Sequence, residues 1–176
     1  MEMIVNIPEG IDVRIENFRV SVSGKNGKLE KDFFTPLFQD LIKIERLNGS
    51  IKISSISDKR KVKSEIGTMA AHIRNMIKGV TEEYVYKLKI IYMHFPITVK
   101  ISGKEVTISN FLGEKSPRKA NIVGDSKVEI NGDMITVKGI NKEYVGQTAA
   151  NIERATKIKA RDRRVFMDGI FMLRRE

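Results

Sequence analysis

The sequence predicts an α+β fold of two tandem, similar domains from an internal duplication, each an antiparallel sheet packed against one helix. Two observations carry this prediction. The segment IGTMAAHI at residues 66–73 recurs as VGQTAANI at 145–152, a shift of 79 positions. The segment VSVSGK at 20–25 recurs as VKISGK at 99–104, with the same shift. A repeat of this length corresponds to a whole small domain rather than to one unit of a solenoid.

A third repeated segment indicates where the two copies differ in length. LNGSI at 47–51 corresponds to INGDM at 130–134, a shift of 83 positions. The second copy therefore carries about four extra residues near 113–125, and the shift returns to 79 before its helix. We place the first α+β repeat at residues 1–80, and the second, with a basic C-terminal extension, at residues 81–176.

Each copy is expected to form strands first and a single helix afterwards. Alternating apolar and polar residues flank Asn26-Gly27, Asn48-Gly49 and Asn131-Gly132, which predicts a hairpin at each of these turns. The first helix is expected to begin at Asp58 and to end at Gly79. The apolar faces expected to meet the core are Val62, Ile66, Ala70, Ile73 and Ile77 in the first helix and Val145, Ala149 and Ile152 in the second.

Both helices carry a glycine beside the apolar face, Gly67 in the first and Gly146 in the second. Glycine inside a helix costs about 1 kcal/mol relative to alanine. We therefore expect a backbone or a sheet to approach each helix closely at this point. The repeated motif is interpreted as packing rather than as a ligand site.

Composition limits the classes of protein that the chain can belong to. With 41% hydrophobic and 31% charged residues it can bury a core. No apolar run approaches the roughly 18 residues that span a bilayer, and the N-terminal segment lacks the features of a signal peptide. There are no cysteines, which excludes disulfides, thiolate metal sites and a cysteine nucleophile. We expect a cytoplasmic protein.

No group of residues fits an active site. The chain has two histidines, His72 and His94, and each is interpreted as a surface or structural residue rather than a base. Residues 24–27 (GKNG) lack the spacing of a phosphate-binding P-loop and are expected in a hairpin. Glu82 and Glu83 are adjacent, so on a strand they point to opposite faces. We expect no enzyme activity, no cofactor, no metal and no small-molecule substrate.

The charge of the chain favours a polyanionic partner only where other features agree with it. The formal net charge is +10, and the stretch from Lys157 to Arg175 holds seven basic and two acidic residues, which is half of the excess. A solvated tail is the alternative interpretation. Three basic residues, 59–61, and Lys63 occupy the start of the first helix, where cations are unfavourable for the helix dipole. An external anionic partner and a solvated helix start both remain open there.

The basic extension also carries an apolar cluster between residues 165 and 172. Apolar side chains there can dock the extension on the domain, so that its arginines face phosphate groups, with which guanidinium forms bidentate contacts. Phe166 and Phe171 can alternatively stack on bases. Anchoring is the favoured interpretation.

Two segments resemble a known family. They are NFLGEK at residues 110–115 and RVFMDGIF at residues 164–171. With them the chain resembles the large-ribosomal-subunit protein six family in its archaeal and eukaryotic form, whose eukaryotic member is called protein nine. The resemblance covers essentially the full length. It implies two similar α+β domains that bind large-subunit ribosomal RNA near the sarcin–ricin region and the translation-factor site, mainly through the C-terminal domain.

The candidate RNA-binding residues come from two sources. The resemblance carries over Lys115, Arg161, Arg164 and Arg175. Charge and proximity in sequence add Arg118, Lys119, Lys157, Lys159, Arg163 and Arg174.

The function expected from the resemblance is that of a structural constituent of the large ribosomal subunit in the cytoplasm, which supports subunit assembly and translation. Its partners would be large-subunit ribosomal RNA and neighbouring ribosomal proteins, with translation factors nearby. Two alternatives from other classes are a tandem RNA- or DNA-binding module acting off the ribosome and a peripheral binder of anionic membrane. The second is disfavoured because the face of the second helix is small and rich in alanine.

Overall fold

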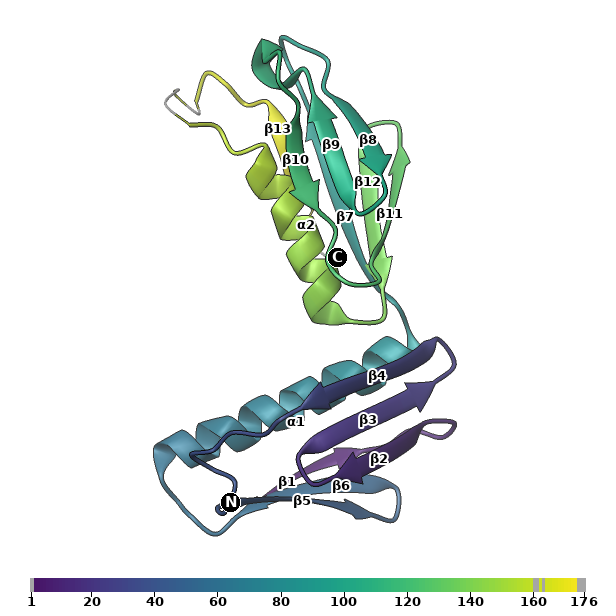
Figure 1. Ribbon diagram of the computed structural model, residues 1–176, viewed down its shortest axis with the longest axis vertical. Helices are drawn as coiled ribbons and strands as arrows, with labels where there is room; N and C mark the ends of the chain where they lie inside the picture. The colour runs from purple at the N-terminus through teal and green to yellow at the C-terminus, as the bar shows by residue number, and fades with distance from the viewer. Residues whose placement is uncertain (1, 160–161, 163, 174–176) are drawn as a thin grey trace. The chain divides into compact units, whose positions relative to one another are not determined.

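The computed structural model describes residues 2–159, 162 and 164–173 of the chain (Figure 1). The chain divides into two compact units, Met1–Glu83 and Tyr84–Glu176. Each unit contains antiparallel sheets and one long helix, which confirms the predicted α+β class with two similar halves. The boundary expected from the sequence lies after residue 80, and the structure divides after Glu83.

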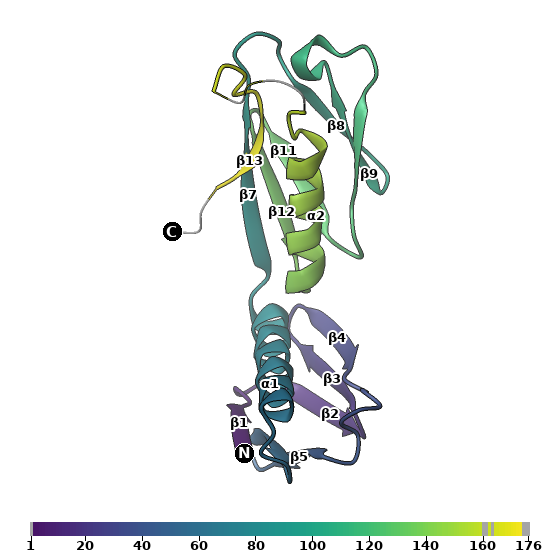
Figure 2. The same cartoon turned by 90° about the vertical axis from the view of Figure 1, so that its left-hand side faces the viewer.

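The described part of the first unit holds two three-stranded antiparallel sheets and the helix α1. The sheets have the strand orders β1-β6-β5 and β2-β3-β4. Helix α1 contacts β1 and β6 of one sheet and β3 and β4 of the other, so that all share one core (Figures 1 and 2). The elements are β1 (Glu2–Asn6), β2 (Asp12–Glu16), β3 (Arg19–Gly24), β4 (Gly27–Asp32), β5 (Ile42–Leu47), β6 (Ser50–Ser55) and α1 (Arg60–Thr81).

The second unit repeats this plan with more strands around its helix. Its described residues form a four-stranded sheet, β11-β12-β7-β13, and a three-stranded sheet, β10-β9-β8. Helix α2 contacts β7, β12 and β13 of the first sheet and β10 of the second (Figure 1). The elements are β7 (Tyr84–Ile91), β8 (Thr98–Ser102), β9 (Glu105–Ser109), the short 3₁₀ turn η1 (Phe111–Gly113), β10 (Arg118–Asn121), β11 (Lys127–Asn131), β12 (Met134–Gly139), α2 (Lys142–Ala155) and β13 (Gly169–Met172).

The register of the strands confirms the three predicted hairpins and the duplication. Hairpin β3–β4 corresponds to β8–β9, and β5–β6 corresponds to β11–β12. Strands β1 and β7 are also equivalent, because each pairs with the strand that precedes the helix. The remaining strands differ: β2 flanks β3 in the first unit, whereas β10 flanks β9 and β13 flanks β7 in the second. Strand β10 lies in the segment where the sequence predicted extra residues.

Both predicted helix faces are buried, but the bounds of the first helix differ from the prediction. Helix α1 begins at Arg60, with Lys59 as the N-cap residue, and the carboxylate of Asp58 lies outside the helix, 3.1 Å from the ammonium of Lys63. This ion pair lowers the pKa of Asp58. The helix continues past Gly79 to Thr81, since the extra turn buries Val80 completely.

The expectation of a close approach at the helix glycines is wrong. A Cβ placed on Gly67 would meet nothing within 4 Å, and on Gly146 it would make only an ordinary contact with the Tyr86 hydroxyl at 3.7 Å. The tight packing in the first unit lies instead at Gly24 of β3, where a Cβ would come within 2.9 Å of Val80 at the end of α1. The sheet thus approaches the helix near its C-terminus rather than beside the repeated motif.

Candidate nucleic-acid interface

The segment Asn110–Lys115 forms a tight loop with an unusual backbone. Asn110 (φ 60°), Leu112 (φ 51°) and Gly113 (φ 74°) all adopt left-handed conformations. For residues other than glycine such conformations are uncommon and persist where surrounding contacts enforce them. Here the Asn110 amide donates to the carbonyl of Pro96 (3.1 Å), and the Phe111 ring is buried. The loop is therefore held in one shape and leaves Lys115 exposed at its end.

Arg118, at the start of β10, turns back toward the protein. Its Nε and Nη2 donate to the two carboxylate oxygens of Glu114 (2.8 and 2.5 Å). Its Nη1 donates to the carbonyl oxygens of Ala155 (2.9 Å) and Lys157 (3.2 Å), at the end of α2. The guanidinium also lies over the Phe111 ring, 4.2 Å from its centroid. The side chain is 25% exposed.

The neighbouring Lys119 points outward from the sheet. Its ammonium lies 3.1 Å from a carboxylate oxygen of Glu105 on β9. The two side chains are 62% and 44% exposed, and pairs at the surface contribute only about 0–1 kcal/mol. Lys119 therefore remains accessible to an anionic partner, whereas Arg118 is occupied.

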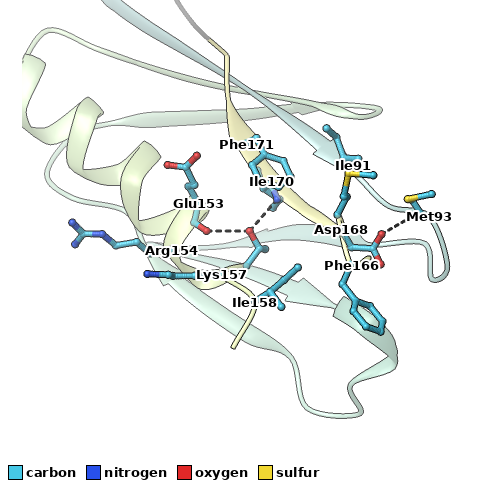
Figure 3. Close-up of a pocket in the computed structure, with 12 residues that line it drawn as sticks. Ile91, Met93, Glu153, Arg154, Lys157, Ile158, Phe166, Asp168, Ile170 and Phe171 are labelled. Atoms are coloured by element: carbon cyan, nitrogen blue, oxygen red, sulfur yellow. Dashed lines mark hydrogen bonds between the residues drawn. The ribbon is translucent and has the colours of Figure 1, made fainter. Parts of the chain in front are cut away.

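The C-terminal end of α2 is joined to strand β13 by a buried threonine. The Thr156 hydroxyl donates to the carbonyl of Glu153 (3.1 Å) and accepts from the amide of Ile170 (2.9 Å) (Figure 3). The Glu153 carboxylate accepts from the amide of Met172 (3.2 Å). Lys157 and Lys159 follow this junction with exposed side chains.

A buried aspartate holds the extension against the end of β7. Asp168 is 1% exposed and accepts a hydrogen bond from the backbone amide of Met93 (2.6 Å) (Figure 3). Its second oxygen lies 3.9 Å from Nδ1 of His94 and has no hydrogen-bond partner within the described part of the chain. The His94 ring in turn contacts Phe166.

The apolar residues of the extension divide into anchoring and exposed ones. Ile170 is buried in the core of the second unit and Phe166 is half-buried, as anchors should be. Phe171 is 36% exposed, and Met167 is 52% exposed. These side chains line an apolar hollow of about 710 Å³ beside the end of α2, with Arg154 and Lys157 among the lining residues (Figure 3).

Several predicted residues lie away from these contacts or outside the described part. Arg164 is almost fully exposed, with its Nε 3.5 Å from the carboxylate of Asp162. The basic start of α1 is exposed as well. Arg161, Arg163, Arg174 and Arg175 fall outside the described residues.

The structure joins Glu114, Arg118 and Lys157 through one set of contacts, although 43 positions separate the first from the last in the sequence. Sequence reasoning missed Glu114, whose carboxylate binds Arg118. The available signal was the spacing of opposite charges four residues apart, which outside a helix has no fixed geometric meaning. It also assigned no role to Asp168, although this residue lies in the segment 164–171 that carries the family resemblance.

The described residues contain no group of His, Asp and Glu side chains that could hold a metal ion. His72 lies close to Lys31, with 3.2 Å between its Nδ1 and the ammonium, and contacts the Phe33 ring. Among the described segments no helix has the length and apolarity that crossing a membrane requires.

The fold and this surface define a basic, duplicated α+β protein with exposed lysines, and comparison with known proteins is consistent with that class. The family model for "Ribosomal protein L6" matches residues 7–83 and 95–169, so the chain belongs to the ribosomal protein L6 family. It is accordingly a structural component of the ribosome and not an enzyme.

Relatives from archaea match along nearly the whole chain. "Large ribosomal subunit protein uL6" of Methanobrevibacter smithii is 47% identical over 98% of this chain and 94% of the relative. The proteins of the same name from Aeropyrum pernix and Staphylothermus marinus are 49% and 50% identical, over 98% and 96% of this chain and 93% and 91% of their own lengths.

Proposed function

We propose that the chain is a constituent of the large ribosomal subunit in the cytoplasm, where it binds large-subunit ribosomal RNA near the sarcin–ricin and translation-factor region. Bound there, it supports subunit assembly and translation. Neighbouring ribosomal proteins are its further partners, and translation factors act nearby. Family membership and the names of the archaeal relatives support the placement in the large subunit.

The observation that carries the RNA-binding proposal is the junction between the Asn110–Lys115 loop and the end of α2. The two segments are far apart in sequence, and Arg118 bonds to both of them. Exposed cations lie at the end of each segment or within a few residues of it: Lys115 and Lys119 on one side, Lys157 and Lys159 on the other. A surface of this kind neutralises closely spaced phosphates, and each contact releases condensed counterions.

Recognition is expected to depend on shape and charge more than on base sequence. Fixed backbone and exposed lysines suit contacts to phosphates and sugars of folded RNA. Arg164 and the arginines outside the described residues (Arg161, Arg163, Arg174 and Arg175) extend the same charge along the chain. The binding constant K should therefore fall as salt rises. In a plot of log K against log salt concentration, each phosphate contact should add about −0.7 to −0.9 to the slope.

Sedimentation of a cell lysate through a sucrose gradient tests the placement. We expect the protein to sediment with large subunits at moderate salt. A protein that stays at the top of the gradient while large subunits sediment would contradict the proposal, and would favour a binding module that acts off the ribosome.

A further inference from the structure

The guanidinium of Arg118 is committed to protein oxygens. Of its five N–H groups, four donate to the Glu114 carboxylate and to the carbonyls of Ala155 and Lys157. Its flat face rests on the buried Phe111 ring. A bidentate contact with a phosphate needs two of these same donors, so RNA would have to break the existing bonds before it could use Arg118.

The partners of Arg118 belong to the two segments that carry the exposed cations. Glu114 directly precedes Lys115 in the tight loop. On the other side, the carbonyl oxygen that Nη1 reaches at 3.2 Å belongs to Lys157 itself. Arg118 therefore fixes the backbone of one candidate phosphate ligand directly and the backbone of the other through its neighbour.

The backbone of the loop adopts a conformation that such contacts stabilise. Asn110 and Leu112 hold left-handed conformations that an isolated loop would leave. At the other segment, the last carbonyls of α2 carry the negative end of the helix dipole, which a guanidinium complements. One side chain thus stabilises both segments.

We propose that Arg118 is a positioning residue, which together with Glu114 holds Lys115 and Lys157 in the arrangement that engages RNA. The name Arg118 clamp is used for Arg118, Glu114, the Phe111 ring and the carbonyls of Ala155 and Lys157. The inference rests on the proposed RNA binding and assigns Arg118 a part other than direct contact with phosphate. It also makes an acidic residue favourable on a surface that binds a polyanion.

Glu114→Gln gives a test in which the two explanations predict opposite signs. Removing a carboxylate from an RNA-binding surface should by charge alone strengthen binding. Loss of the bidentate pair in the clamp should instead weaken it, by about fivefold. Glu105→Gln is the matched control, because it removes the same charge from the adjacent strand, β9, and frees Lys119. It should raise affinity, by up to about twofold.

Arg118→Lys tests the other side of the clamp. The substitution keeps the charge but loses the planar fork that reaches a carboxylate and two carbonyls at once. If Arg118 positions other residues, affinity should fall by about 5- to 10-fold despite the unchanged net charge. A bidentate phosphate contact would also be weakened by lysine, so the amide spectrum of the free protein decides between the two: a changed resonance at Lys157 in free Arg118→Lys supports the clamp, and an unchanged one contradicts it.

The experiment uses the full-length chain and in vitro transcribed large-subunit ribosomal RNA in filter-binding titrations, with amide NMR spectra of the RNA-free proteins. The clamp predicts weaker binding by Glu114→Gln, stronger binding by Glu105→Gln, and an altered amide resonance at Lys157, which is distant in sequence from the substitution, in free Glu114→Gln. An unmoved resonance at Lys157, or tighter binding by Glu114→Gln, would overturn the clamp. Failure of the wild-type chain to bind would instead overturn the proposed function, while the spectra still decide on the clamp.

Discussion

The two units use different side chains to donate hydrogen bonds to the backbone carbonyls at the end of their helix. In the first unit the turn of hairpin β3–β4 covers the end of α1: the Asn26 amide donates to the carbonyl of Thr81 (3.0 Å), and its backbone N–H to that of Val80 (3.1 Å). The shift of 79 positions places Glu105 where Asn26 stands. A carboxylate has no donor to give, and in the second unit Arg118 bonds to the end of α2 instead.

This difference places the proposed RNA-binding surface beside elements that the two copies do not share. In the first unit the donor to the end of the helix is the neutral amide of Asn26, from the hairpin that both units share. In the second unit the donor is the cation Arg118 on β10, a strand with no counterpart in the first unit. The second unit also has an additional strand, β13, beside β7. The elements outside the duplicated scaffold meet at the end of α2, where the exposed lysines lie.

The largest effect is expected from truncation after Ile158. The change removes β13 and with it Ile170, which is 1% exposed. Loss of a buried isoleucine alone costs about 2–5 kcal/mol, so the free energy of unfolding of the second unit should fall by at least that amount. RNA binding should be lost. Amide hydrogen exchange should show unchanged protection in the first unit, and equal loss in both units would contradict their independence.

Asp168→Ala is expected to have the next largest effect. It removes the part-buried hydrogen bond from the amide of Met93, and a hydrogen bond to a charged group contributes about 1.5–3 kcal/mol. Asp168→Asn is the matched control, because the side-chain carbonyl can still accept that hydrogen bond and the amide can donate toward His94. Urea denaturation followed by amide signals of the second unit measures both. Equal loss in the two variants would show that charge, not the acceptor, matters.

Asn26→Ala should weaken the corresponding contact in the first unit. The bond from its side chain to Thr81 is exposed, and such a bond contributes about 0.5–1.5 kcal/mol. The free energy of unfolding of the first unit should fall within that range, with no effect on RNA affinity. A marked loss of RNA binding would mean that the end of α1 also takes part in recognition.

Gly67→Ala should have the smallest effect, and it should be stabilising. Open space surrounds the site, and alanine is favoured over glycine inside a helix by about 0.5–1 kcal/mol. Thermal unfolding monitored at the first unit measures the gain. Gly146→Ala in the equivalent position should also be tolerated, since its new methyl group meets the Tyr86 hydroxyl at an ordinary distance. Destabilisation by Gly67→Ala would contradict the open site.

Sequence patterns predicted the features that depend on periodicity. The buried faces of both helices, the hairpin turns and the duplication follow from spacing that residue types reveal directly. The division of each unit into two sheets was not predicted. Alternating apolar and polar residues indicate a strand, but they do not indicate which other strand pairs with it. Gly79 was predicted to end α1, but the helix continues past it, because Val80 is buried.

The candidate site was predictable only as a set of charges. Lys115 and Arg118 look alike in sequence, since both are basic residues in one loop region. In the structure Lys115 is exposed, whereas Arg118 faces Glu114 and the end of α2. The direction of a long basic side chain depends on acceptors that arrive from distant segments, here Ala155 and Lys157. The density of basic residues in the sequence therefore predicts where the candidate surface lies. It does not tell which basic residues are exposed and which, like Arg118, bond to other parts of the protein.

Salt-dependent filter binding with charge-matched triple variants tests the central claim most directly, namely that the second unit carries RNA binding. One variant changes Lys115, Lys157 and Lys159 to glutamine. The other changes Lys59, Arg60 and Lys61 to glutamine. Both lose three positive charges. We expect the slope of log K against log salt to fall by about 2 for the first variant and to stay unchanged for the second. Equal slopes for the two variants, or a fall only in the second, would contradict the account.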